Sequence, residues 1–342
     1  MIRYIVRRLL LLIPVLLGMT LITFSVTKAI PVNPVIASIS QTAADHPEIV
    51  AAYRKEWGLD KPFLVQYLIY VRNLLHGNLG VSIYTHRPVV DDLRTYLPAT
   101  IELATTTIIF SVVVSVPLGI LAATRRGGAI DLIVRILTLM GVAMPIFWLA
   151  LLLLDVFYLH LGWAPDPGRL SYSLTPPPTL TGLYVVDALI AGEPGIAWNA
   201  LCHLALPSLV LATWSAGLLT RMTRASMLTV LPQDFLRNVR SKGASNFYVI
   251  RKHAAPNATI PVITVVGLAY GDLLSGALVV ETIFGWPGIG LYAYNAAIHA
   301  DFPAMTGVTL VVGFIYTLLN LVIDIIYALI DPRVRASLTV AA

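Results

Sequence analysis

Long apolar runs separated by shorter polar segments dominate this chain. Six of these runs reach the roughly 20 mostly apolar residues that a helix needs to cross the hydrocarbon core of a bilayer. They lie at about 9–30, 99–123, 130–161, 201–220, 259–281 and 305–330. The pattern therefore predicts six transmembrane helices.

The runs read as helices because they are apolar on every face. Leu9–Leu17 and Ala150–Leu154 show no alternation, whereas the strands of a membrane barrel alternate apolar and polar residues in short segments. The first run is long for a signal sequence, and no clear small-residue cleavage site follows it, so we expect it to be retained. The predicted fold class is an all-α integral membrane protein.

The composition agrees with this class, because 57% hydrophobic and only 12% charged residues leave too little charge for the surface of a soluble domain. The net charge of +5 does not call for a nucleic-acid partner, since the basic residues are spread over short loops at helix ends. Cys202 is the only cysteine, which excludes an intramolecular disulfide. His160, His203 and His299 lack ligand spacing, so we expect no metal site.

Basic residues also predict the orientation, because short loops rich in Lys and Arg stay on the cytoplasmic side. With the N-terminus inside, most of the cations fall on that side. They are Arg3, Arg7, Arg8, Arg125, Arg126, Arg221, Arg224, Arg237, Arg240, Lys242, Arg251, Lys252, Arg333 and Arg335. We expect a multi-pass protein of the cytoplasmic (inner) membrane with both termini in the cytoplasm.

The predicted spans divide the chain into four parts. These are an N-terminal basic segment with the first helix (1–30), an external subdomain (31–98), a five-helix core (99–330) and a cytoplasmic tail (331–342). Helical patterning in the external subdomain is interrupted at Gly58 and Pro62. Within the core, the Pro- and Gly-rich segment 162–200 predicts an irregular external lid or collar, and 221–258 forms a cytoplasmic loop.

The cytoplasmic loop reads as two short helices. Pro232 and Asp234 favour a helix start, and the helix Phe235–Lys242 should stop at Gly243. Ser245 or Asn246 can cap a second helix through 247–253, which Pro256 should break before the fifth span. Spacing alone leaves two interpretations open: an interfacial connector with snorkelling cations, or a docking helix for a partner.

The segment Arg237-Asn238-Val239-Arg240-Ser241-Lys242-Gly243 resembles the cytoplasmic "EAA" loop of ATP-binding-cassette (ABC) importer permeases, in the form found in the dipeptide/oligopeptide branch. The resemblance extends along almost the whole chain. Further matching blocks are Gly58–Pro62, Gly77–Gly80, Arg87–Val89, Leu97–Thr100, Val279–Phe284, Trp286–Gly290, Asp301–Pro303 and Asn320 through Arg333.

This resemblance implies the MetI-like fold of a type I ABC importer permease. Such a permease pairs with a second, similar permease, two ATPase subunits bind the cytoplasmic loops, and an extracytoplasmic binding protein delivers the substrate. Transport of di- or oligopeptides, or related small solutes, then follows alternating access powered by the ATPases. The chain itself would not be an enzyme and would hold no cofactor, because ATP and Mg bind to the partner subunits.

By the same resemblance, Arg237–Gly243 forms the coupling helix that sits in a groove on an ATPase. The expected coupling residues are Asp234, Arg237, Asn238, Val239, Arg240, Ser241, Lys242 and Gly243. Asn238, Val239 and Ser241 depart from the family's usual Thr, Ala and Ala, and Pro256 stands where the family often has a basic residue. The bulk of Val239 is expected to limit the depth of docking.

Polar residues inside the spans are candidates for a pathway, because a buried charge is costly unless it is paired or faces a cavity. Asp272 lies in the middle of the fifth span near Tyr270 and Ser275. One hypothesis is that Asp272 lines the translocation route and favours substrates with an amino group or another cation. A hydrogen-bonded packing role is an equal alternative.

The other polar residues in or near the spans are expected to be structural. Glu281 precedes the turn Trp286-Pro287-Gly288 and should anchor the outer gate, and Asp155 and Glu102 should be interfacial. The last span carries polar residues at near four-residue intervals, which places them on one face as an interhelix network. These are Asn320, Asp324, Tyr327 and Asp331.

Two other classes of function stay open on the residues alone. A proton-coupled secondary transporter could use Asp272, Asp155 or Asp324, and a membrane scaffold would not transport at all. The sequence contains no phosphate-binding loop, zinc-type histidine pair or serine nucleophile elbow. The substrate is not evident from this chain, since proteins that resemble it also carry nickel chelates, haem, glutathione or oligosaccharides.

Overall fold

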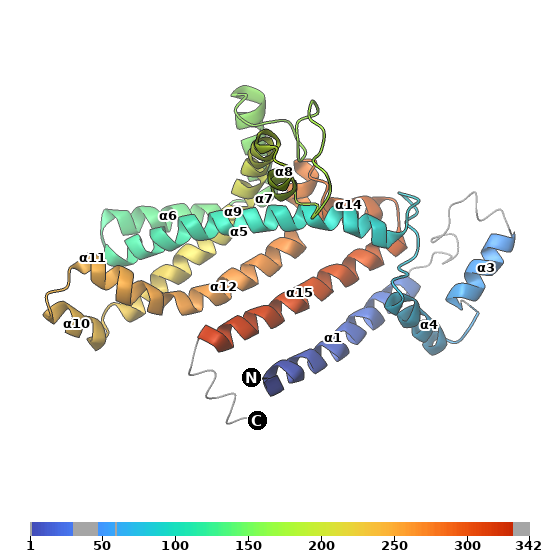
Figure 1. Ribbon diagram of the computed structural model, residues 1–342, viewed down its shortest axis with the longest axis horizontal. Coiled ribbons are helices and arrows are strands. Elements are labelled where there is room, and N and C mark those ends of the chain that lie inside the picture. The colour runs from blue at the N-terminus through green and yellow to red at the C-terminus, as the bar shows by residue number, and fades with distance from the viewer. Residues whose placement is uncertain (1, 30–46, 59, 331–342) are drawn as a thin grey trace.

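Figure 1 shows the computed structural model, which describes residues 2–29, 47–58 and 60–330. Its long helices are α1 (Ile2–Ala29), α5 (Val89–Thr124), α6 (Ala129–Ala143), α9 (Pro194–Val230), α12 (Ala255–Gly276) and α15 (Phe302–Ile330). Its short helices are α3 (Pro47–Trp57), α4 (Phe63–Leu75), α7 (Ile146–Leu153), α8 (Tyr184–Ile190), α10 (Asp234–Ser241), α11 (Asn246–Tyr248), α13 (Leu278–Ile283) and α14 (Ile289–Ile298). Two π-helical segments are η1 (Leu154–His160) and η2 (Val249–Ala254). The predicted all-α class is confirmed.

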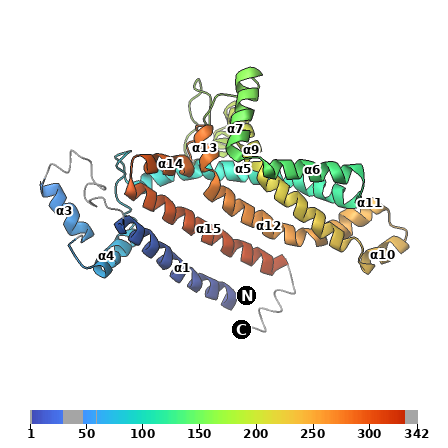
Figure 2. The same ribbon diagram turned by 180° about the vertical axis from the view of Figure 1, so that it is seen from behind.

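Helices α5 and α9 form the central pair of the fold and run side by side in both views (Figures 1 and 2). Small residues let them approach closely, since a Cβ added at Gly119 of α5 would lie 2.6 Å from Cβ of Thr223 in α9. The hydroxyls of Ser111 and Ser215 are hydrogen-bonded across the same contact at 2.7 Å. Such close packing is a main attraction between helices in lipid, because lipid tails are as apolar as the side chains themselves.

The other long helices add to this pair in order. α6 and α12 pack on α9, α15 packs on α12, and α1 packs on α15 (Figure 1). Glycines again mark the contacts: a Cβ at Gly217 of α9 would lie 2.5 Å from Val142, and one at Gly267 of α12 would lie 2.4 Å from Ile323. In both views the start of α1 and the end of α15 point toward the side of the molecule that α10 occupies.

The number of spans depends on one bent pair. Five described helices are long and apolar enough to cross a membrane, and a sixth span exists only if α6 and the α7–η1 segment count as one. These two meet at an angle of 100°, so the run predicted at 130–161 as one helix is two helical segments, and a single span there stays a prediction. Pro145 explains the break, because proline disfavours the α conformation of the preceding residue, and Met144 is extended at ψ 131°.

Proline inside the other helices does not break them. α5 starts at Val89 and α9 at Pro194, earlier than the predicted spans, and both continue through internal prolines, Pro98 and Pro207 among them. Membrane helices tolerate proline because neighbouring helices and polar side chains satisfy the freed backbone groups. The apolar runs therefore mark only the middle of each helix, and the ends extend into more polar sequence.

Helix α4 packs onto α1, and α3 packs onto α4. Gly58, which has φ +59°, and Pro62 separate α3 from α4, as the sequence predicts. Phe24 of α1 contacts the rings of Phe63, Tyr67 and Tyr70 of α4 at centroid distances of 5.3–5.8 Å. Residues 31–46 and 59, which also belong to the predicted subdomain, lie outside the described residues.

A buried ion pair fastens the external collar, residues 162–200, to α5. The Arg169 guanidinium lies 2.6 Å from the Glu102 carboxylate, and both side chains are buried. Arg169 also donates to the Gly182 carbonyl oxygen at 2.8 Å and stacks over the Tyr184 ring at 3.7 Å, while Glu102 accepts the Val185 N–H at 2.9 Å. Glu102 is therefore a buried anchor within the protein, and its predicted place at the membrane interface stays a prediction.

The collar is also tied within itself at Asp187 of α8. This carboxylate accepts the backbone N–H of Thr181 and of Gly182, each at 2.8 Å, and the Thr181 hydroxyl at 2.7 Å. Burial opposes ionisation, but these hydrogen bonds outweigh it and hold the pKa of Asp187 below its usual value. The segment 162–200 thus contains an ordered turn and a short helix.

The α5–α9 contact predicts the outcome of adding one methyl group. Gly119→Ala should destabilise the protein by about 1–3 kcal/mol, because the new Cβ overlaps Thr223 in a packed interface. Gly18→Ala in α1 is the matched control, because nothing lies within 4 Å of its Cβ position. Thermal unfolding in detergent measures both variants, and equal melting temperatures would contradict the close contact.

The Arg169–Glu102 pair predicts a strong effect of removing one partner. Glu102→Ala leaves a buried guanidinium without its counter-charge and should cost about 3–5 kcal/mol. Asp91→Ala breaks an exposed pair with Arg94, 3.8 Å long, and should cost under about 1 kcal/mol. The free energy of unfolding in mixed micelles separates the two cases; similar losses in both variants would argue against a buried anchor.

Candidate functional site

Helix α10 protrudes at one end of the molecule, beyond the ends of α5, α6 and α9 (Figures 1 and 2). It begins after Gln233, which is extended and makes no side-chain cap, so Asp234 is the first helical residue. Gly243 follows its C-terminal end in the left-handed region at φ +82° and donates its N–H to the Arg240 carbonyl at 3.0 Å. Glycine adopts this conformation without strain, which explains the predicted stop.

One face of α10 is anchored in an apolar cluster. Leu236 is fully buried, and Val239 packs beside it against Met227 and Val230 of α9 and Val249 of η2. Val239 therefore lies on the anchoring side of α10, where its side chain packs in the cluster. This placement does not support the expectation that its bulk limits the depth of docking. Any displacement of α10 acts directly on α9 and η2.

The opposite face is exposed, basic and partly aromatic. Asp234 and Arg237 form an exposed pair at 3.7 Å, while Arg240 and Lys242 extend the positive charge to the helix end. We call the exposed residues of this region the basic surface: Phe235, Arg237, Asn238, Arg240, Ser241 and Lys242, with Phe247 and Tyr248 of α11. Exposed rings beside arginines are a composition typical of protein interfaces.

The second helix of the loop does not end at Pro256. Ser245 caps it by accepting the Tyr248 N–H at 3.4 Å, and the chain then runs as one helix from Asn246 to Ser275. The predicted break is therefore wrong. The π-helical turn η2 directly precedes Pro256, and a local change to π geometry is one way in which membrane helices accommodate proline.

A bidentate ion pair fixes the inner end of α9 near this surface. Arg224 donates to both oxygens of Asp131 in α6, at 2.6 and 2.9 Å, and Asp131 also accepts the Gly127 N–H at 3.0 Å. Bidentate arginine–carboxylate pairs are directional as well as strong. The base of α10 is thus held by a rigid junction of α6 and α9.

The residues expected at the outer gate come together around Glu281. This fully buried carboxylate accepts the Thr100 hydroxyl at 2.7 Å and the Leu291 N–H at 3.0 Å. Trp286, also fully buried, donates its indole N–H to the Ala99 carbonyl at 2.9 Å. A Cβ at Gly288 would lie 2.4 Å from the Glu281 carboxyl, and Pro287 is partly buried. The group clamps the α13–α14 turn onto α5; a gating role stays a prediction.

The residues proposed for a pathway separate onto two faces of α12. The Tyr270 hydroxyl is hydrogen-bonded to Thr105 of α5 at 2.9 Å, so Tyr270 points into the bundle. Asp272 and Ser275 are exposed. Asn320 is partly buried in α15, whereas the side chain of Asp324 and all of Asp331 lie outside the described residues. Asp155 is exposed on η1, 3.5 Å from His160.

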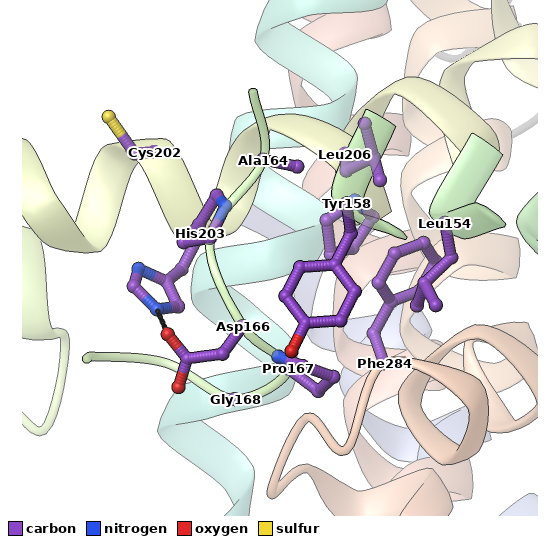
Figure 3. Close-up of a pocket in the computed structure, with 12 residues that line it drawn as sticks. Leu154, Tyr158, Ala164, Asp166, Pro167, Gly168, Cys202, His203, Leu206 and Phe284 are labelled. Carbon is purple, nitrogen blue, oxygen red and sulfur yellow. Dashed lines mark ion pairs between the residues drawn. The ribbon is translucent and has the colours of Figure 1, made fainter. Parts of the chain in front are cut away.

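A small cavity lies where the collar meets η1 and α9 (Figure 3). His203 and Asp166 point toward each other there, 3.8 Å apart, while the Cys202 sulfur points away. The cavity holds about 10 Å³, roughly the space of one water molecule, which is too small for a solute. Among the described residues, no group of three or more His, Cys, Asp and Glu could hold a metal ion.

Comparison with known proteins agrees with this geometry. Residues 115–336 match the family described as binding-protein-dependent transport system inner membrane component, and residues 1–104 match the N-terminal model for such membrane components. The dipeptide transport system permease protein DppB of Alkalihalophilus pseudofirmus is 44% identical over 98% of this chain and 100% of its own length. The probable D,D-dipeptide transport system permease protein DdpB of Escherichia coli K12 is 44% identical over 94% of each chain.

A solved structure shows the same fold. The MetNI methionine ABC transporter, in inward-facing conformations, matches with a TM-score of 0.50 over 68% of this chain and 93% of its own chain. Its sequence identity is 16%, so this likeness concerns the fold alone.

The family match and the relatives place this chain in the class of multi-pass permeases of ABC importers. The chain belongs to the family of binding-protein-dependent transport system inner membrane components. The resemblance inferred from the sequence is thereby confirmed, and the family favours an importer over a proton-coupled transporter or a scaffold.

The contacts of Glu281 predict that removing the Thr100 hydroxyl lowers the stability of the protein. Thr100→Val removes the donor to Glu281 and the acceptor of the Ile289 N–H, 2.8 Å away, and should destabilise the protein by about 1–3 kcal/mol. Thr95→Val is the control, because the exposed Thr95 hydroxyl bonds only its own helix. Unfolding midpoints in detergent measure both, and an unchanged midpoint for Thr100→Val would contradict the clamp.

Proposed function

We propose that this chain is the transmembrane permease subunit of an ATP-driven importer that carries dipeptides or related small solutes across the cytoplasmic membrane. Two relatives that match it over at least 94% of their own length are named dipeptide or D,D-dipeptide permeases. The single observation that carries the mechanism is α10, buried on one face, basic on the other, and placed at the end of the bundle. No catalytic residue is assigned to the chain.

The basic surface is the proposed coupling site for a partner ATPase. Arg237, Arg240 and Lys242 supply positive charge that an acidic groove would complement. Leu236 and Val239 anchor the helix to α9 and η2, so a push on the basic surface reaches the spanning helices without an intervening flexible segment. ATP and Mg would bind to the ATPases, and closure of those subunits would drive alternating access.

Further partners complete the proposed assembly. A second, similar permease would pack beside this chain, two ATPases would bind the cytoplasmic loops, and an extracytoplasmic binding protein would deliver the substrate. Both termini would be cytoplasmic. The placement of α10 supports this orientation, because the start of α1 and the end of α15 point toward the same side.

The proposal predicts that charge reversal on the basic surface uncouples ATP use from transport. In liposomes holding the complete transporter, Arg237→Glu with Arg240→Glu should lower ATP hydrolysis stimulated by loaded binding protein, and dipeptide uptake, by about tenfold or more, because like charges would face each other at the interface. Arg94→Glu is the matched control, since Arg94 is 78% exposed at the start of α5 and away from α10.

Co-purification of the membrane subunits shows whether the variant complex still assembles. Uptake that persists in the double variant, or that proceeds without ATP, would overturn the coupling role. Loss of activity in the Arg94→Glu control as well would show that the effect is not specific to α10.

A further inference from the structure

Asp272 differs from the other acidic side chains described on the spanning helices and the bent pair. Each of the others lies within 4.0 Å of a basic side chain. Those others are Asp91, Asp92, Glu102, Asp131 and Asp155. Asp272 is exposed about one turn before the C-terminal end of the apolar helix α12, and its carboxylate has no hydrogen-bond or ion-pair partner among the described residues.

The face on which Asp272 lies is the one that α12 leaves uncovered. Tyr270 faces α5 through its bond to Thr105. Gly271 faces α15, where a Cβ would lie 3.0 Å from the Tyr316 ring. The third face carries Leu268, which is 44% exposed, then Asp272 and Ser275, spaced four and three residues apart on one side of the helix.

The structural carboxylates Glu102, Asp131 and Glu281 have more partners than Asp272. Each contacts a basic or hydroxyl side chain and also accepts a hydrogen bond from a backbone N–H. The donors are Val185 for Glu102 (2.9 Å), Gly127 for Asp131 (3.0 Å) and Leu291 for Glu281 (3.0 Å). Ser275 is no such donor to Asp272, because its hydroxyl bonds the Gly271 and Asp272 carbonyls at 2.9 and 3.2 Å. Asp272 is therefore not held as a packing residue.

A free carboxylate on a spanning helix is costly to place against lipid, so water or a cation is its favoured neighbour. A single acid in a water-filled passage attracts a cation only weakly, which suits a site that must also release its ligand. A peptide substrate carries such a cation in its α-ammonium group, and a second one where it contains lysine or arginine.

We propose that the Leu268–Asp272–Ser275 face of α12 lines the translocation route and that Asp272 binds the ammonium group of cationic peptides as they pass. The inference rests on the proposed importer function and adds a charge preference to it. The route would run between this face and the second permease. Selection by Asp272 would act after release from the binding protein.

The test uses liposomes with the complete transporter and saturating loaded binding protein, so that uptake reports passage through the membrane subunits. Three probes are compared: Lys-Ala, Ala-Ala and Ala-Glu. In the wild type, Lys-Ala should enter faster than Ala-Glu. Asp272→Asn should lower the ratio of these two rates by about fivefold. This is the change expected from losing the attraction between two unit charges about 4 Å apart in water, which is about 1 kcal/mol. Asp272→Glu should largely keep the ratio.

Asp155→Asn is the matched control, an exposed carboxylate on η1 that should leave the ratio unchanged. An unchanged ratio in an Asp272→Asn complex that assembles and hydrolyses ATP would overturn the inference alone. Loss of co-purification with the second permease in Asp272→Asn would also overturn it, by identifying Asp272 as a contact between subunits. Absence of ATP-dependent uptake in the wild type would instead overturn the proposed function, and the inference with it.

Discussion

The close contact between α5 and α9 is the constraint on which the rest of the structure depends. Gly119 and the Ser111–Ser215 pair bring the two backbones together, and the two helices have 36 and 37 residues, well beyond the length of one bilayer crossing. The outer part of α5 carries Thr100 and Glu102, which hold the α13–α14 turn and the collar. The inner part of α9 carries the apolar cluster that seats α10. One helix pair therefore connects the collar and the α13–α14 turn at one end of the bundle to α10 at the other.

Ion pairs of carboxylates hold the helices together near their ends, and close contacts between small residues hold them together in the middle of the bundle. In the hydrocarbon region, packing is the available attraction, so glycine and serine mark the contacts. Toward the two ends, charges can be paired at lower cost, and Glu102 and Asp131 join segments that are distant in sequence. Small residues thus keep the middle of the bundle close-packed, and ion pairs hold the ends of its helices.

Sequence reasoning reached the helical class, the turn at Gly243 and the resemblance to importer permeases, because apolar length, glycine conformation and a seven-residue block are local signals. It could not find the anchor formed by Glu102, since its partner Arg169 stands 67 positions away. It also placed a break at Pro256 and none at Pro145, although the structure has the reverse. Whether a proline bends a helix depends on the neighbours that satisfy its backbone, which the local sequence does not contain. The inward face of Val239 likewise depends on how α10 is seated.

The uninterrupted helix from Asn246 to Ser275 has a mechanical consequence. At about 1.5 Å per residue, its 30 residues form a helix roughly 45 Å long. The aromatic end, at Phe247 and Tyr248, lies beside α10, and Asp272 lies near the far end. If this helix turned as a unit, a twist imposed at its α11 end would also swing the distant carboxylate around the helix axis. Force and charge selection would then be timed by the same rotation.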